Sequence, residues 1–344
     1  MERIPIDEFI SRMSDSPAFD VRTPKEFAAG HIPGAINLPL FTNEERAVVG
    51  TIYKKNGRDK AVFTGLDIVG PKMRWLAETM RKNARNGRVL VHCWRGGMRS
   101  GSTAWLAEFC GIEAAVLEKG YKAYRNWCID RFNEDRRIVI LSGRTGTGKT
   151  EILGHLSRMG EEVIDLERLA HHKGSAFGAL GENKQPTQEQ FENELGMALS
   201  RLRPGARVWI EDESREIGYC SVPDPFFKKM RSAPVIRVDT PRARRTEYLY
   251  TIYGSFNPYF LAEAAKKIER RLGPDRTRAC LAAIESGDIK TAIDISLEYY
   301  DKGYDMSFAK RNGESPVIPL ASSDENSFED IARQLVACAD SHGF

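Results

Sequence analysis

The sequence predicts an α/β protein with two domains, each built on a parallel sheet. The chain has 344 residues, which is long for one compact core and comfortable for two. Short apolar runs alternate with helix-like stretches twice along the chain. Such alternation is typical of parallel sheets covered on both faces. A polar, charged stretch at 126–137 separates the two alternations, so we expect domains at 1–130 and 135–344.

Local signals position the elements of the first domain. Thr23 is a candidate helix cap, and Pro24 suits the first helical position, so a helix is expected from Pro24 onward. Gly111 closes a later helix. The other elements expected there are a strand over 17–22, a short strand within 30–39, a helix over 71–83, a strand over 88–92 and a helix over 100–110.

The second domain repeats the pattern after the charged stretch. An apolar strand comes first, and a helix is expected from Lys149. An amphipathic helix is expected within 322–344. The strands expected in this domain cover 138–141, 162–165, 207–211 and 235–239.

Composition narrows the class of protein. Hydrophobic residues at 41% and charged residues at 29% describe a soluble globular protein, and a net charge of +3 does not by itself indicate a polyanionic partner. No stretch approaches the roughly 18 apolar residues of a membrane span, and the N-terminus has no apolar signal core. We therefore expect no membrane partner and a cytoplasmic location. The six cysteines form no Cys-x-x-Cys pair, which argues against zinc and a disulfide framework.

A cysteine lies where a buried strand ends and a helix begins. Backbone N–H groups of a tight loop and the positive end of the helix both favour thiolate over thiol at Cys93. Gly96 and Gly97 allow the loop to curl, while Arg95 and Arg99 add charge for an anionic substrate. An inert buried cysteine is the alternative, but this combination favours Cys93 as a nucleophile.

The motif alone leaves the reaction open. His92 to Arg99 fits His-Cys-x5-Arg, the pattern of cysteine phosphatases, so attack on phosphorus and attack on sulfur or selenium both remain. Upstream, Asp20-Val21-Arg22-x-x-x-Glu26-Phe27 and Gly30-His31-Ile32-Pro33-Gly34-Ala35-Ile36-Asn37 resemble the rhodanese pattern. The resemblance implies a rhodanese-like α/β domain whose cysteine carries a sulfur atom. Phosphate-handling relatives have a loop one residue longer, as here, and the wider cradle suits selenium or a selenophosphate.

A phosphate-binding motif opens the second domain. The motif fits Gly-x-x-x-x-Gly-Lys-Thr between an apolar strand and a helix, the context of a Walker A loop. Its amides cradle a diphosphate, which indicates a P-loop NTPase-like domain with a parallel sheet. The motif comprises Gly143, Arg144, Thr145, Gly146, Thr147, Gly148, Lys149 and Thr150.

Metal binding and ligand identity stay open at this motif. Thr150 and Asp212 are the candidate magnesium ligands, with Glu211 and Asp165 as alternatives, because each acid ends a strand. A nucleotide is the ordinary ligand of such a loop, but any ligand carrying a diphosphate satisfies the same geometry.

A basic segment lies at about 225–280. Residues 225–279 contain thirteen Lys or Arg against five Asp or Glu, with aromatic residues between them. Basic side chains neutralise backbone phosphates and aromatic rings stack on RNA bases, so RNA binding is one interpretation. A solvated helix face or a nucleotide lid is the alternative. The candidate RNA-binding residues are Arg242, Arg244, Arg245, Lys266, Lys267, Arg270 and Arg271.

The order of the two motifs resembles the tRNA 2-selenouridine synthase family. Cys-Trp-Arg-Gly-Gly-Met-Arg-Ser at 93–100, the motif at 143–150 and His-His-Lys-Gly-Ser-Ala-Phe-Gly at 171–178 carry the resemblance. It implies conversion of 2-thiouridine to 2-selenouridine at the tRNA wobble position, with selenophosphate as donor. It also implies an S-geranyl-2-thiouridine intermediate made from geranyl diphosphate.

The resemblance assigns roles to residues. Cys93 would carry selenium as S-selanylcysteine, and Arg95, Gly96, Gly97 and Arg99 would bind selenophosphate. Residues 143–150 would hold the diphosphate of geranyl diphosphate. Thiolated tRNA and a selenophosphate-supplying enzyme are the implied partners, and no tightly bound organic cofactor is expected. A cysteine phosphatase fused to a P-loop kinase, and a non-catalytic RNA-binding ATPase, are the rival interpretations.

Overall fold

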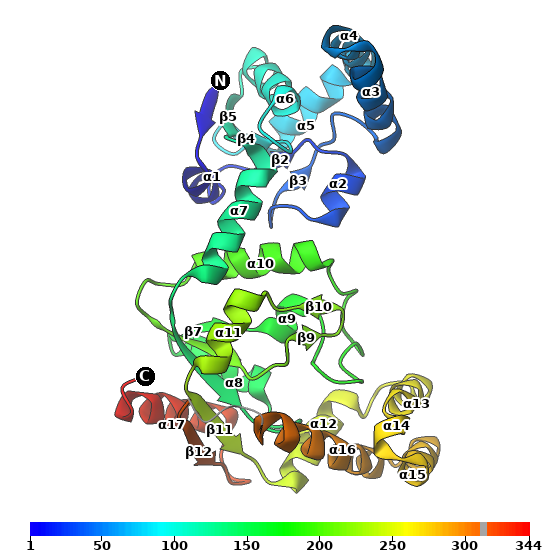
Figure 1. Ribbon diagram of the computed structural model, residues 1–344, viewed down its shortest axis with the longest axis vertical. Helices are drawn as coiled ribbons and strands as arrows, with labels where there is room; N and C mark the ends of the chain where they lie inside the picture. Colours follow the sequence, from blue (N-terminus) through cyan, green and yellow to red (C-terminus); the bar gives the residue numbers. More distant parts are fainter. Residues whose placement is uncertain (310–314) are drawn as a thin grey trace. The chain divides into compact units, whose positions relative to one another are not determined.

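The computed structural model describes residues 1–309 and 315–344. Backbone contacts divide it into two compact units, shown with their elements in Figure 1. Unit 1 comprises Met1–Arg131 together with Glu189–Met197, and unit 2 comprises Phe132–Gln188 together with Ala198–Phe344. Each unit therefore contains residues from two separate stretches of the chain.

Unit 1 is built on a five-stranded parallel sheet in the order β1-β5-β4-β2-β3. Its strands are β1 (Glu2–Ile4), β2 (Ala18–Asp20), β3 (Ile36–Asn37), β4 (Arg88–His92) and β5 (Glu113–Leu117). Its helices are α1 (Ile6–Arg12), α2 (Pro24–Ala29), α3 (Asn43–Asn56), α4 (Arg58–Val69), the 3₁₀ turn η1 (Gly70–Lys72), α5 (Met73–Asn83), α6 (Met98–Phe109), most of α7 (Gly120–Asn133) and most of α10 (Gln188–Ser200).

Alternating side chains of β4 bury both faces of this sheet. Val89 and Val91 pack in a core with Leu76 of α5 and Ala104 of α6. His92 points to the opposite face, where its ring lies against Phe9 and Tyr121 of α1 and α7. Both faces of the sheet are thus covered, and the carboxyl end of β4 lies at the edge of the sheet.

Helix α10 completes unit 1 from a distant part of the chain. The side-chain amide of Asn193 donates to the carbonyl of His31 at 2.9 Å and to the hydroxyl of Tyr121 at 2.7 Å. Gln190 accepts from the backbone N–H of His31 at 2.9 Å. Asn193 is fully buried, so these hydrogen bonds belong to the interior of the unit.

Unit 2 has a second five-stranded parallel sheet in the order β12-β11-β6-β8-β7. Its strands are β6 (Arg137–Ser142), β7 (Glu162–Ile164), β8 (Arg207–Glu211), β11 (Val235–Asp239) and β12 (Val317–Ala321), beside a small antiparallel pair β9 (Glu216–Ile217) and β10 (Cys220–Ser221). Its helices are α8 (Lys149–Arg158), α9 (Leu166–Ala170), α11 (Asp224–Ser232), α12 (Arg242–Tyr253), α13 (Pro258–Lys267), α14 (Glu269–Leu272), α15 (Pro274–Glu285), α16 (Ile289–Ala309) and α17 (Phe328–Ser341).

Two hydrophobic clusters hold unit 2 together. In the first, α8 and α17 pack on the sheet, with Leu153 and Leu335 against Trp209 of β8. The second lies among α12, α13, α15 and α16, with Leu249 and Leu297 in its interior. This helical cluster extends from the sheet and forms one wall of the pocket described below.

Both sheets are parallel, so the predicted fold class is confirmed. The predicted strands at 88–92 and 207–211 have the observed bounds, and Thr23 caps α2 through a capping box with Glu26. Other bounds differ by one or two residues: α6, for example, begins at Met98, two residues before the expected start, and α5 begins at Met73, two residues after it. Within the described residues, no helix is both long and apolar enough to cross a bilayer.

Candidate active sites

The first candidate site is the cysteine loop (residues 93–99), which connects β4 to α6. Cys93 directly follows β4, and the parallel pairing of Asp20 with His92 places the cysteine at the carboxyl edge of the sheet. The Cys93 side chain is 3% exposed. Its Sγ lies 3.2 Å from Oγ of Ser100 in the first turn of α6.

Hydrogen bonds favour the ionised form of this cysteine. Burial would raise the pKa of the Cys93 thiol. The Ser100 hydroxyl, the amides of Ser100 and Arg95, and the charge of Arg99 outweigh burial and hold that pKa below its ordinary value. The thiolate is the nucleophilic form, so this environment supports Cys93 as the candidate nucleophile.

Two glycines allow the loop its close turn. Gly96 has φ +64°, and a Cβ there would lie 2.6 Å from the carbonyl oxygen of Leu117. A Cβ on Gly120 would lie 2.3 Å from the carbonyl oxygen of Cys93. Gly97, in contrast, faces open space. Sequence reasoning singled out Gly96 and Gly97 but missed Gly120, which only the packing of β5 and α7 against the loop brings near.

Glu26, from the upstream motif, holds the Arg99 side chain of the cysteine loop in place. Arg99 donates two hydrogen bonds to the Glu26 carboxylate, at 2.8 and 3.3 Å. Glu26 also accepts from the N–H of Thr23 at the start of α2. Burial raises the pKa of Glu26, but Arg99 and the Thr23 amide lower it overall, so the carboxylate is charged and orients the guanidinium. Arg95 lies exposed at the rim.

The histidines of unit 1 are structural. His92 is fully buried, and burial lowers its pKa, so the imidazole is neutral and has no access to a substrate. His31 stacks on Phe27 with ring centroids 3.9 Å apart, and its Nδ1 lies 3.0 Å from the Phe27 carbonyl oxygen. Neither ring is placed to exchange protons with the Cys93 sulfur.

A cavity of about 1000 Å³ adjoins the cysteine loop, and we call it the cationic cavity. Its described lining includes five Lys or Arg side chains and no Asp, Glu or His. The apolar part of the wall comes mainly from the α3–α4 hairpin and the segment before it. The cations are Arg46, Lys54, Arg58, Arg95 and Arg99, and the apolar residues include Leu40, Phe41, Val49, Val62, Leu66 and Val69.

The second candidate site is the phosphate loop (residues 143–150), which connects β6 to α8. Gly146 and Gly148 have φ +86° and +82°. A Cβ on Gly148 would lie 2.4 Å from the Phe328 ring, so only glycine fits there. The Thr147 hydroxyl donates to the carbonyl of Arg144 at 2.7 Å and holds the loop curled. The loop thus has the shape of an anion cradle at a helix N-terminus.

Carboxylates surround the lysine of this loop. Lys149 Nζ lies 3.8 Å from Glu213, and the Thr150 hydroxyl donates to Glu167 at 3.4 Å. Burial lowers the pKa of Lys149, but Glu213 and Glu167 outweigh it and raise the pKa, so the ammonium is charged. Burial, and then repulsion from Glu167, raises the pKa of Glu213 well above its ordinary value. A cation or a proton is therefore favoured beside the cradle.

The acids at the carboxyl end of β8 divide between two sides of the chain. Glu211 accepts from the N–H of Glu167 at 2.8 Å, on the side of the loop lysine. Asp212 accepts instead from the Ser142 hydroxyl at 2.6 Å. The amide of Glu213 donates to the carbonyl of Glu211 at 2.9 Å, so the chain turns at Asp212. Glu213 is therefore the acid beside Lys149 that sequence reasoning missed. Among the described residues, no group of three or more His, Cys, Asp or Glu side chains has the arrangement of a metal site.

Two arginines support the phosphate loop from outside. Arg144 pairs with Asp305 at 2.9 Å, so its guanidinium is directed away from the cradle. Arg245 is 2% exposed, donates to the carbonyl of Thr145 at 3.1 Å and pairs with Asp301 at 2.8 Å. A buried arginine whose terminal nitrogens bond to Thr145 and Asp301 is not accessible to RNA, so Arg245 stabilises the loop and leaves the predicted RNA-binding set.

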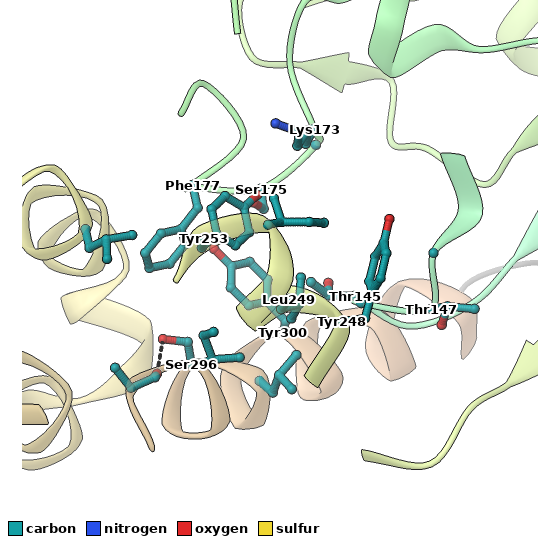
Figure 2. Close-up of a pocket in the computed structure, with 18 of the residues that line it drawn as sticks. Thr145, Thr147, Lys173, Ser175, Phe177, Tyr248, Leu249, Tyr253, Ser296 and Tyr300 are labelled. Carbon is teal, nitrogen blue, oxygen red and sulfur yellow. Dashed lines mark hydrogen bonds between the residues drawn. The ribbon is translucent and has the colours of Figure 1, made fainter. Parts of the chain in front are cut away.

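An apolar pocket of about 160 Å³ opens directly onto the phosphate loop. Figure 2 shows Thr145 and Thr147 at one end and Phe177, Tyr253 and Tyr300 along the cavity. Cavities of this size lined by Leu, Ile and Phe take apolar ligands. The remaining apolar lining consists of Leu249, Ile252, Leu261, Ile284, Ile289, Ala292, Ile293 and Leu297.

The few polar groups deep in the apolar pocket bond to the protein. Ser296 donates to the carbonyl of Ala292 at 2.9 Å, and the Cys280 sulfur lies 3.6 Å from the Ser296 hydroxyl. Lys173 and Ser175 lie nearer the phosphate loop (Figure 2). The pocket therefore combines an anion cradle at one end with an apolar interior at the other.

The basic segment presents fewer free cations than its composition indicated. Arg242 pairs with Asp294 at 2.6 Å, and Arg244 donates to the carbonyls of Ser323 and Asn326. The exposed cations are concentrated on α13 to α15, where Tyr259 and Phe260 are 65% and 54% exposed. The predicted residues on this surface are Lys266, Lys267, Arg270 and Arg271.

Comparison with known families agrees with this pair of sites. A rhodanese-like domain matches residues 6–126, and a tRNA 2-selenouridine synthase AAA domain matches residues 136–335. The first match contains the cysteine loop and the second contains the phosphate loop.

Several tRNA 2-selenouridine synthases are similar over long stretches. The protein from Marinobacter nauticus is 34% identical over 339 residues, covering 88% of this chain and 91% of that one. The protein from Shewanella loihica is 36% identical over 339 residues, covering 87% and 88%. The protein from Nitrosomonas europaea is 39% identical over 250 residues, covering 70% of this chain and 64% of its own length, just under two thirds.

Proposed function

This chain belongs to the tRNA 2-selenouridine synthase family, and we propose that it converts 2-thiouridine to 2-selenouridine at the tRNA wobble position in two half-reactions. In the first, the sulfur of the base displaces diphosphate from geranyl diphosphate and becomes S-geranylated. In the second, selenium from selenophosphate displaces geranyl thiolate from carbon 2. The phosphate loop serves the first half-reaction and the cysteine loop serves the second.

The apolar pocket beside the phosphate loop is the observation that carries the geranyl half of this proposal. Geranyl diphosphate is an anion joined to a branched hydrocarbon chain. The loop amides and Lys149 suit the diphosphate, and the Leu and Ile side chains of the pocket suit the hydrocarbon. As the carbon–oxygen bond breaks, charge grows on the diphosphate, and the same groups stabilise it.

A nucleotide is the rival ligand of the phosphate loop. A base is normally read by polar groups placed at the pocket wall. The deep polar groups here, Ser296 and Cys280, are engaged with Ala292 and with each other. An apolar chain leaves no buried polar group unmatched in such a pocket, whereas a base would.

The cationic cavity supports the selenation half of the proposal. Its five Lys and Arg side chains suit the charge of selenophosphate, and the Cys93 thiolate lies at its floor. The hydrophobic wall from the α3–α4 hairpin suits the geranyl group of the intermediate. One cavity can thus receive both the anionic donor and the geranylated base.

Exposed residues of α13 to α15 form our proposed tRNA-binding surface. Lys266, Lys267, Arg270 and Arg271 would neutralise phosphates, and Tyr259 would stack on an unpaired base. Replacement of Lys267 and Arg270 by Ala should weaken tRNA binding and reduce the salt slope by roughly 0.7–0.9 for each phosphate that is no longer neutralised. Lys60→Ala, an exposed charge on α4, is the matched control. An unchanged slope would exclude this surface.

Mass analysis of nucleosides tests the function as a whole. Thiolated tRNA should gain an S-geranyl group with the protein and geranyl diphosphate alone, and should gain selenium when selenophosphate is added. The order matters, because selenium should not enter if geranyl diphosphate is left out. Selenation that needs ATP and ignores geranyl diphosphate would overturn the proposal in favour of a nucleotide-dependent enzyme.

A further inference from the structure

Tyr248 of α12 lies where the apolar pocket meets the phosphate loop. Residues three and four apart share one face of a helix, so Tyr248 and Leu249 both lie one turn beyond Arg245. This face of α12 covers Gly146, where a Cβ would lie 3.0 Å from Cβ of Arg245 and 3.0 Å from Cδ1 of Leu249. Tyr248 therefore extends from the part of α12 that rests on the loop.

The ring of Tyr248 is also held from its other side. It meets the Phe328 ring edge-on, with centroids 5.2 Å apart, and Phe328 in turn fits against Gly148 of the phosphate loop. In the view of Figure 2, the ring lies between Thr147 of the loop and the Tyr300 ring of the pocket. The side chain is thus fixed at the junction of the anion cradle and the apolar interior.

The bond that breaks during geranylation would lie at this junction. The inference rests on the proposed function, which places the diphosphate in the phosphate loop and the hydrocarbon in the apolar pocket. Carbon 1 of the geranyl chain then lies at the mouth of the pocket, joined to an oxygen of the diphosphate. A side chain at the junction can touch that oxygen.

The Tyr248 hydroxyl is available for such a contact. Among the described residues, no group forms a hydrogen bond with it, although the hydroxyls of buried tyrosines usually have a partner. The hydroxyls of Tyr253 and Tyr300, which line the same pocket, bond to Ser175. A ring that only packed against Phe328 would not need a hydroxyl.

Several other donors at the mouth of the pocket are already engaged. The Thr147 hydroxyl donates within the loop at 2.7 Å, and Lys173 pairs with Glu182 at 2.6 Å. Lys149 supplies the positive charge of the cradle, and Tyr248 adds a neutral donor from the side of the pocket.

We propose that the Tyr248 hydroxyl donates a hydrogen bond to the diphosphate oxygen that leaves carbon 1 of the geranyl chain, which makes Tyr248 a catalytic residue of the first half-reaction. As the sulfur of the base bonds to carbon 1, the carbon–oxygen bond breaks with its electron pair on that oxygen. The N3 proton of the base passes to solvent. The hydrogen bond strengthens as charge grows on the oxygen, so it lowers the barrier.

The surroundings of Tyr248 keep its hydroxyl a donor. Burial, and then the charges of Glu151 and Glu167, raise the pKa of Tyr248 above its ordinary value. The phenol therefore stays protonated near neutral pH. It keeps this proton throughout the reaction, so no later step is needed to restore it.

The test measures release of diphosphate by the full-length protein in a single turnover, with thiolated tRNA and saturating geranyl diphosphate. Tyr248→Phe removes one oxygen and keeps the ring against Phe328. Release should slow on the order of ten- to a hundred-fold, the scale of one hydrogen bond to a charged group, while affinity for geranyl diphosphate changes less than about three-fold. Tyr250→Phe is the matched control on the same helix, because Tyr250 is 40% exposed and its ring faces Lys290.

A fluorinated side chain gives a second measurement that packing alone would not affect. Replacement of Tyr248 by 3,5-difluorotyrosine keeps the hydroxyl and makes it more acidic. Geranylation should then fall at alkaline pH, because ionisation of the phenol removes the donor, whereas the wild type should show no such fall over the same range. A Tyr248→Phe rate within two-fold of the wild type, a loss confined to affinity, or a fluorinated protein with the wild-type pH profile would overturn the proposal.

Failure of this proposal and failure of the proposed function give different results. Without tRNA, water can take the place of the base, and the protein should slowly release diphosphate and geraniol. If Tyr248→Phe slows this hydrolysis but tRNA is never geranylated, the proposed function fails and the role of Tyr248 stands. If both proteins geranylate tRNA equally, the role of Tyr248 alone fails. A wild type that releases no diphosphate in either assay contradicts both.

Discussion

The cysteine loop and the phosphate loop have the same backbone plan and different side chains at the centre. Each follows a buried parallel strand, turns through glycine at positive φ and ends at a helix N-terminus. The first places the Cys93 sulfur in the cradle and the second places the Lys149 ammonium beside it. We expect the cradle of amides to bind an anion in both cases. The side chain at the centre then determines the expected reaction: the Cys93 sulfur can attack, whereas the Lys149 ammonium can stabilise a departing anion.

The charges around the two loops are also opposite. The described lining of the cationic cavity has no carboxylate, whereas Glu167 and Glu213 lie beside Lys149. A carboxylate near Cys93 would oppose both the thiolate and its anionic substrate. Near a diphosphate, carboxylates suit a divalent cation bound to the substrate oxygens. A test of whether geranylation requires magnesium would therefore distinguish the two loops.

The largest expected effect is loss of selenation while S-geranylation is retained. Cys93→Ser should reduce selenation on the order of a thousand-fold or more, the scale of losing a catalytic nucleophile. S-geranylation should stay within about two-fold of the wild type, because the phosphate loop is intact. Nucleoside mass analysis of each half-reaction measures both. Equal loss of both activities would contradict the division of labour between the loops.

The reciprocal variant acts on the other loop. Lys149→Ala should slow geranylation by about a hundred- to a thousand-fold, because a donor to the departing diphosphate is lost. Selenation of tRNA that already carries S-geranyl-2-thiouridine should be unaffected in the same preparation. Lys60→Ala again controls for loss of one positive charge. Unimpaired geranylation in Lys149→Ala would show that the loop does not hold the diphosphate.

A smaller effect should follow from shortening the apolar pocket. Ala292, on α16, lines the pocket and is 4% exposed. Ala292→Phe should reduce use of geranyl diphosphate about ten-fold or more, since overpacking of a fitted site costs about 1–3 kcal/mol. Dimethylallyl diphosphate, which has half the carbon chain, should be affected less. Steady-state rates with both substrates give the ratio, and Ala279→Phe on the exposed face of α15 is the control.

The smallest expected effect is on the pH dependence of Cys93 alkylation. Burial raises the pKa of Cys93, but hydrogen bonds from Ser100 and Arg95 and the charge of Arg99 hold it below its ordinary, unfolded value. Its thiolate therefore adds stability above the unfolded pKa, and this contribution is lost as pH falls through the folded value. Alkylation of Cys93 should reach half its maximal rate at a lower pH than alkylation of a short cysteine peptide, and Arg99→Gln should move that midpoint upward. Burial raises the pKa of Cys128 to about 12, so Cys128 serves as the unreactive internal reference.

The sequence predicted those parts of the fold whose signals are local. Both loops lie between a strand and a helix of expected type, because turn glycines and apolar runs are contiguous in the chain. The α3–α4 hairpin was missed, since α3 buries no residue and α4 buries only Ala61 and Gly65. Without an apolar stripe, a helix leaves no periodic signal.

The environments of the loops depend on contacts that no local pattern encodes. The apolar pocket brings together Phe177, Leu249 and Leu297 from segments far apart in the chain. Glu213 was overlooked because the three successive acids that begin at the last residue of β8 look equivalent in sequence, and only the direction of each side chain distinguishes them. Arg245 looked like an RNA-binding residue because composition does not report burial.

Helix α10 has a consequence for how the protein is made. His31, Tyr121 and Arg125 complete their hydrogen bonds with residues 189–193, which the ribosome synthesises only after the phosphate loop. A nascent chain that stops at Arg131 holds every strand of the first sheet and still lacks the helix that closes it. We therefore expect the cysteine-bearing unit to reach its full stability only after translation has passed residue 197, and a fragment that ends at Arg131 should leave the groups that bond to α10 without these partners.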